Sequence, residues 1–165
     1  MLLGGYIGLE EQAALIILFN LQTSVGQVSV GLGLTAEVYT REGRPVGLLY
    51  IFGMVSMAGV SLGLYLARFT LSSITHNPLA ADLVLQAMGS MLIFACIEGA
   101  RVVFGAILSG HGRSNVVALS NMFSFGISLS AACILTFAIE FGIEGFWFGL
   151  SFGQLIQVLL FAHLI

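Results

Sequence analysis

The sequence contains very little charge and no lysine. Only 8% of its 165 residues are charged, all five basic residues are arginines, and the formal net charge is -3. A soluble domain carries charge on roughly a quarter of its residues, whereas here 58% of the residues are hydrophobic and the mean hydropathy is +1.05. No basic cluster suited to nucleic acid is present. The composition therefore predicts a protein of the lipid bilayer with no nucleic-acid partner.

Residues that bind metals or carry covalent chemistry are also scarce. Cys96 and Cys133 lie inside apolar runs, where a cysteine usually serves as a small packing residue. The three histidines, His76, His111 and His163, are not spaced as metal ligands. The sequence shows no catalytic set of nucleophile, base and orienting residue, and no glycine-rich phosphate-binding loop after a strand. We expect no enzyme activity, no metal site and no cofactor.

Five apolar segments are each long enough to cross a bilayer, which takes about 20 residues as a helix. Because backbone polar groups cannot stay unpaired in hydrocarbon, each segment is predicted to be a continuous helix. The predicted fold is all-α, a single transmembrane bundle over residues 1–165 with helices at 13–36, 47–67, 83–108, 116–139 and 145–165.

The charges between these segments predict how the chain is oriented. Three of the five arginines, Arg41, Arg44 and Arg113, lie in the first and third connections, and only Arg68 lies on the side of the second and fourth. Cytoplasmic loops carry the excess of basic residues. The first and third loops are therefore predicted to be cytoplasmic in a multi-pass membrane protein.

Glu98 and Arg101 are charged residues inside the third predicted helix. Placing an acid at such a depth costs about 2.5–3.5 kcal/mol on insertion scales, so intramembrane ionisable groups are candidates for function. Burial favours the neutral acid, whereas a cation three residues away on the same helix face favours the carboxylate. Two interpretations stay open: Glu98 handles an ion or substrate, or the two residues form a structural ion pair.

Other features of the apolar segments have a structural interpretation and a functional one. Asn20, Gln22, Gln27 and Asn121 are amides within helices, and interhelical hydrogen bonding is the simpler role, favoured for Gln22 and Gln27. Gly145, Gly149 and Gly153 form a small-residue ladder on the last helix, which lets another helix approach closely. The ladder serves either packing within the chain or an interface with another subunit.

Three stretches together resemble the multidrug and toxic compound extrusion (MATE) family. Residues 98–112, EGARVVFGAILSGHG, resemble the family's tenth helix, in which an acid precedes small residues and Gly-x-Gly. Residues 141–150, FGIEGFWFGL, are similar to the entry of its last core helix, and residues 31–37 to its eighth helix. Asn121 matches an asparagine early in the eleventh helix. The order of these motifs covers nearly the whole chain.

The resemblance implies the second six-helix lobe of a twelve-helix transporter, without that lobe's first helix. The family exports organic cations, xenobiotics or metabolites by antiport against H⁺ or Na⁺, in plasma or vacuolar-type membranes. Glu98 corresponds to the acid linked to ion coupling or substrate binding, and Asn20 to an eighth-helix site residue; both are expected to face the central cavity. Arg101 departs from the family, where this residue is small or uncharged, and is a possible modulator of Glu98.

The resemblance leaves alternatives of other classes. The chain is a piece of a longer transporter, a truncated gene product, or a half that assembles with a second half-transporter chain. It is alternatively a non-transporting membrane partner that packs through the glycine ladder, or a related flippase for lipid-linked precursors.

Overall fold

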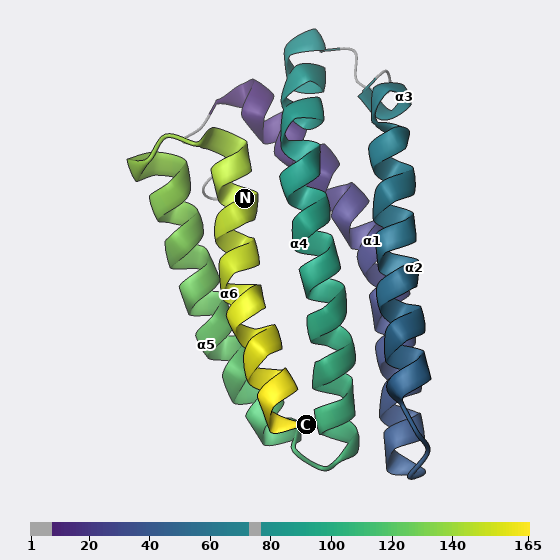
Figure 1. Ribbon diagram of the computed structural model, residues 1–165. Coiled ribbons are helices and arrows are strands. Elements are labelled where there is room, and N and C mark those ends of the chain that lie inside the picture. Colours follow the sequence, from purple (N-terminus) through teal and green to yellow (C-terminus); the bar gives the residue numbers. More distant parts are fainter. Residues whose placement is uncertain (1–7, 73–76) are drawn as a thin grey trace.

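The computed structural model describes residues 8–72 and 77–165, and all regular structure in these residues is helical (Figure 1). Five helices are long and apolar enough to cross a membrane, when the π-helical segment η2 is counted with α5. The predicted all-α bundle is confirmed. In chain order the elements are α1 (Leu9–Arg41), α2 (Gly47–Leu66), α3 (Arg68–Ser72), α4 (Pro78–Gly110), α5 (Ser114–Cys133), η2 (Ile134–Ala138) and α6 (Gly142–Leu164).

Two helices are longer than hydropathy predicts, because local interactions extend them beyond their apolar cores. At the end of α1 the carboxylate of Glu37 accepts a hydrogen bond from Arg41 one turn on, which supports helix up to residue 41 rather than 36. At the start of α4 the side chain of Asn77 accepts hydrogen bonds from the backbone N–H groups of Leu79 and Ala80. With Pro78 at the first helical position, this cap starts α4 at residue 78 rather than 83. His76, which lies just before this cap, is outside the described residues.

The predicted fourth helix is not α-helical to its end. The segment after Cys133 continues as a π-helix, in which the N–H of Ile139 bonds to the carbonyl of Ile134. The chain then turns sharply, with positive φ angles of 61° at Glu140 and 53° at Gly142, and α6 begins at Gly142 instead of Gly145.

Arg68 starts a separate short helix, α3, after the end of α2. Its guanidinium stacks 4.1 Å from the ring centroid of Tyr65.

Helix α4 lies at the centre of the bundle and contacts every other α-helix (Figure 1). It is buried on several faces, whereas α2 and α5 are mostly exposed on the outside of the bundle. On α1 the buried positions recur every three or four residues, as in Leu18, Val25, Ser29 and Gly33, so that one stripe faces α4. The large exposed apolar side chains of α1, α2, α5 and α6 would contact lipid.

The main hydrophobic cluster joins α1, α4 and α6 around Trp147, which is fully buried. Its ring lies 5.0 Å from that of Phe19 on α1 and 5.4 Å from that of Phe94 on α4. Aromatic contacts at these separations add to the packing of the three helices. This cluster fixes how α1 and α6 are placed on the two sides of α4.

The glycine ladder of α6 packs against α5 and η2 within the chain. A Cβ atom added to Gly149 would overlap the backbone N and Cα atoms of Ala132, and one added to Gly153 would overlap the Oγ atom of Ser128. The hydroxyl of Ser124 also donates a 2.8 Å hydrogen bond to the carbonyl of Gly153. The ladder face is therefore occupied by α5 and is not available for a separate subunit in this arrangement.

The connections alternate between the two ends of the bundle. The loop between α1 and α2 and the loop between α4 and α5 lie at the same end as the C-terminus, and the α5–α6 turn lies at the other end (Figure 1). Arg113, at the start of α5, donates a 2.8 Å hydrogen bond to the carbonyl of Leu164, which ties the C-terminus to this end. Arg41, Arg44 and Arg113 therefore share one end of the bundle, as the predicted topology requires.

Close approach at Gly149 gives a test of this packing. Gly149→Ala should destabilise the bundle by about 1–3 kcal/mol, since the added methyl meets backbone atoms that cannot move aside. Gly126→Ala is the matched control, because nothing lies within 4 Å of an added Cβ there. The control should be neutral or slightly stabilising. Thermal unfolding in detergent micelles measures both, and equal stability of the two variants would contradict the α5–α6 packing.

Candidate functional site

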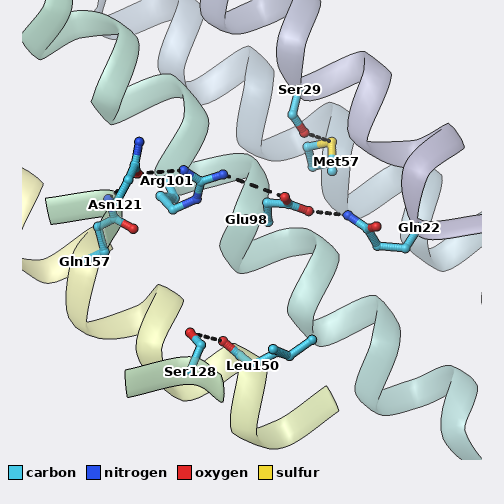
Figure 2. Close-up of polar contacts among 9 residues, drawn as sticks. All are labelled: Gln22, Ser29, Met57, Glu98, Arg101, Asn121, Ser128, Leu150 and Gln157. Carbon is cyan, nitrogen blue, oxygen red and sulfur yellow. Dashed lines mark hydrogen bonds and ion pairs between the residues drawn. The ribbon is translucent and has the colours of Figure 1, made fainter. Parts of the chain in front are cut away.

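A continuous series of polar side chains crosses the middle of the bundle and joins α1, α4, α5 and α6 (Figure 2). It runs from Gln22 through Glu98 and Arg101 to Asn121 and Gln157. In hydrocarbon such groups are stable only when they are paired with one another or open to water. We call these five residues the polar chain.

Glu98 is held by donors from two directions. The side-chain amide of Gln22 on α1 donates to its Oε2 atom, and the Nη2 atom of Arg101 lies 3.6 Å from its Oε1 atom. The carboxylate therefore has a neutral partner on a neighbouring helix and a cationic partner on its own helix.

Arg101 extends from Glu98 toward α5. Its Nη1 atom donates a 3.1 Å hydrogen bond to the Oδ1 atom of Asn121, while its Nε atom is buried and has no partner among the described residues. The side chains of Glu98 and Arg101 are only 22% and 20% exposed, so that their interaction is largely shielded from solvent. The guanidinium thus bridges the acid on α4 and the amide on α5.

Asn121 is anchored in turn by Gln157. The side-chain amide nitrogen of Gln157 donates to the same Oδ1 atom that accepts from Arg101. Gln157 is 2% exposed, while Asn121 lies on the exposed face of α5. The two donors fix the orientation of the Asn121 amide, with its oxygen turned toward the guanidinium.

A smaller set of contacts supports α4 on the side of α2. Gly99, next to Glu98, packs closely on Met57 of α2 and Ser29 of α1, and the hydroxyl of Ser29 donates to the Met57 sulfur (Figure 2). One turn earlier the Cys96 thiol donates to the hydroxyl of Ser61. Both predicted packing cysteines are free thiols.

The structure does not bring Asn20 to Glu98. Asn20 precedes Gln22 by two residues, which places the two side chains about 200° apart around α1. Gln22 faces α4, and Asn20 lies on an exposed face together with Ser24 and Gln27. Asn20 and Glu98 are therefore not in contact in this chain, and their facing one central cavity stays a prediction.

Gln157 is the member of the polar chain that sequence reasoning missed. It lies within the apolar run at the end of α6, four residues after Gly153 and thus on the same face as the glycine ladder. That shared face points toward α5 and would have identified Gln157 as a buried partner of an α5 side chain. Gln154 also has a buried amide oxygen without a partner among the described residues.

Metal binding finds no support in the described part of the chain. No three His, Cys, Asp or Glu side chains gather there in a way that would hold a metal ion.

Comparisons with curated proteins find transporters. Over 168 residues the chain is 29% identical to multidrug and toxin extrusion protein 1 of Xenopus tropicalis, covering 91% of this chain and 28% of that protein. It is 26% identical over 160 residues to multidrug and toxin extrusion protein 2 of Oryctolagus cuniculus, and 26% identical over 162 residues to protein DETOXIFICATION 17 of Arabidopsis thaliana. These matches cover 88% and 90% of this chain, and 26% and 34% of the relatives. No protein-family model matches.

Solved structures show the same fold. A MOP superfamily transporter from Pyrococcus furiosus superimposes with a TM-score of 0.88 at 20% identity, over 96% of this chain and 38% of that one. The eukaryotic MATE transporter AtDTX14 gives a TM-score of 0.84 at 18% identity, over 94% and 37%. This chain resembles part of a MATE transporter. It spans between 26% and 30% of the length of the first curated relatives.

The interaction between Glu98 and Arg101 can be measured by a double-mutant cycle. Glu98→Gln or Arg101→Leu alone should each lower the free energy of unfolding by about 3 kcal/mol, because each leaves a shielded charge without its counter-ion. The double variant should be less destabilised than the sum, with a coupling energy of about 1–3 kcal/mol. The control cycle uses the exposed Glu37–Arg41 pair, for which we expect about 0.3–0.5 kcal/mol. Equal coupling in the two cycles would show that the inner pair is not formed.

Proposed function

We propose that this chain is the second lobe, without its first helix, of a secondary antiporter. In this proposal the complete protein exports small organic, mainly cationic, substrates or metabolites in exchange for H⁺ or Na⁺. The observation that carries the proposal is similarity along about nine tenths of the chain to proteins named multidrug and toxin extrusion proteins. Their transporter role and the five apolar helices support transport across a lipid bilayer rather than an enzymatic reaction.

The polar chain supports a functional site in this lobe. Glu98 and Arg101 are the only Asp, Glu, Lys or Arg residues in the five long helices that lie outside the first and last five residues of a helix. Charges at such depth are costly and are retained where they bind ions, substrates or each other. We assign the coupling or binding role to Glu98, and a modulating role to Arg101.

The exposed face of α1 supports the presence of a second half. Asn20, Ser24 and Gln27 lie on that face one turn apart, so polar groups follow a helix that would otherwise contact hydrocarbon. The Ser24 hydroxyl donates to the backbone carbonyl of Asn20, and a water-filled cavity or a further set of helices would satisfy the two amides. Asn20 would then line the central cavity as its family counterpart does. The second half comes from the same longer chain or from a separate half-transporter.

Alternating access requires two halves that move around a central site. The chain covers less than a third of its first relatives, so we propose that transport needs the longer protein or assembly. In a plasma or vacuolar-type membrane the first and third loops would face the cytoplasm, because these loops hold Arg41, Arg44 and Arg113.

Substitution of Glu98 tests the proposed role. In the complete transporter Glu98→Gln should abolish efflux of a fluorescent organic cation driven by a pH or Na⁺ gradient, because the variant lacks the ionisable group. Glu37→Gln removes an acid at the exposed end of α1 and is the matched control. The five-helix chain alone, reconstituted in liposomes, should show no efflux. Gradient-driven efflux by Glu98→Gln at the level of the control would refute the assignment.

A further inference from the structure

We propose that the junction of α2 and α3 binds a membrane phospholipid, whose phosphate group contacts Arg68 and whose acyl chains lie against the adjoining face of α2. This surface is at the end of the bundle opposite the C-terminus (Figure 1). The proposal requires that the chain spans a bilayer, and it depends neither on the transport role nor on the polar chain.

Arg68 differs from the other arginines in what its guanidinium contacts. Each of the others has a carboxylate or carbonyl acceptor within the chain; they are Arg41, Arg44, Arg101 and Arg113. The Arg68 guanidinium makes no ion pair and no hydrogen bond with the residues that the structure describes. Residues 1–7 and 73–76 contain no Asp or Glu that would supply a carboxylate. An anionic acceptor for Arg68 must therefore come from outside the chain.

Two aromatic rings hold the guanidinium of Arg68 in place. Its Cζ atom lies 4.1 Å from the ring centroid of Tyr65, near the end of α2, and 4.8 Å from that of Phe69 in α3. Such cation–π contacts restrain the guanidinium but provide no oxygen acceptor for its N–H donors. The planar fork of these donors matches the oxygens of a phosphate group. Arg68 is therefore a positioned cation whose donors suit a phosphate.

The surface next to Arg68 is apolar and exposed. Leu62 and Leu66 lie one turn apart on α2 and are 59% and 72% exposed, and Phe69 is 66% exposed. The exposed apolar surface continues to Val55 in the middle of α2. Tyrosine rings are enriched at the level of the lipid headgroups, and arginines extend their charged ends to that level. The order of the cation and the apolar surface along this face therefore matches the phosphate and the acyl chains of one phospholipid.

The position of α3 in the bundle leaves this surface on the outside. Helix α3 lies beside α4 at the outer edge, whereas the α5–α6 turn, with Glu140 and Glu144, lies on the other side of α4 (Figure 1). Most of α2 is likewise exposed. In a bilayer this edge of the bundle faces lipid, which supplies both the phosphate and the apolar chains that the surface requires.

Site-specific photocrosslinking identifies what lies against this surface. p-Benzoylphenylalanine replaces Leu66 in the full-length protein that contains this chain, in detergent micelles with equal amounts of phosphatidylglycerol and diacylglycerol of the same acyl chains. Mass spectrometry of the cross-linked peptide counts the two lipids. Phosphatidylglycerol should be captured about tenfold more often, because it alone offers Arg68 a charged acceptor. With Arg68→Gln the two lipids should be captured equally.

Matched controls separate this contact from general lipid binding. Arg41→Gln removes a guanidinium whose partner, Glu37, lies at the other end of the bundle, and should leave the preference unchanged. The same crosslinker in place of Val55 should capture both lipids equally, with or without Arg68. Tyr65→Leu removes one of the two rings and should lower the preference, since Tyr65 positions the guanidinium. Inorganic phosphate at the concentration of the lipid should not compete, because it lacks acyl chains.

The wild-type result decides the proposal even if Arg68→Gln fails to fold. Equal capture of the two lipids by the wild type would overturn the proposal, as would crosslinking of residue 66 to a protein segment instead of lipid. Loss of the preference on addition of inorganic phosphate would show a site for free phosphate and refute the assignment to lipid. Efflux does not enter the measurement, so the result is independent of the proposed transport function.

Discussion

The ion pair of Glu98 and Arg101 is the constraint on which the arrangement of the bundle depends. A charged pair within an apolar helix is tolerated only when further hydrogen bonds satisfy the N–H groups and oxygen lone pairs that the two ions do not pair with each other. Gln22 supplies one such bond from α1, and Asn121 supplies another from α5, itself oriented by Gln157 of α6. Four helices must therefore meet at one level with defined rotations, and α4 must be their common neighbour.

Packing around α4 fits this requirement. Small residues allow the helices to approach closely where polar side chains bond between them. Gly99 lets α1 and α2 lie against α4 beside Glu98. Gly149 and Gly153 bring α6 onto α5, on the same face of α6 that carries Gln157. Trp147 fills the space between α1, α4 and α6 and fixes their separation. Because most other contacts are apolar and would be equally favourable in lipid, the polar chain and the close glycine contacts supply most of the specificity of the fold.

The sequence predicts features that depend on the spacing of residues along one helix. It does not predict features that depend on how two helices are rotated relative to each other. Hydropathy locates five spans, and the three-residue spacing of Glu98 and Arg101 is enough to place both side chains on one helix face. Gln22 lies 76 residues from its partner Glu98, and Gln157 lies 36 residues from its partner Asn121. Which helix face Gln22 and Gln157 occupy follows only from packing. Asn20, two residues before Gln22, lies on the exposed face of α1 and does not contact Glu98. The π-helical end of α5 was missed because no proline or glycine marks residues 134–138.

The central claim is that Arg101 contacts Glu98 and Asn121 at the same time inside the bilayer. Solid-state NMR of the chain in lipid bilayers, with ¹⁵N in the arginine guanidinium groups and ¹³C in the glutamate carboxyl and asparagine amide carbons, measures these contacts directly. The variant Arg41→Gln/Arg44→Gln removes the two exposed Arg–Glu pairs, so that a remaining correlation reports the inner pair. The account predicts that one guanidinium shows correlations to a glutamate carboxyl and to an asparagine amide carbon, and that Glu98→Gln removes the glutamate correlation. A spectrum in which no guanidinium correlates with a glutamate carboxyl would contradict it.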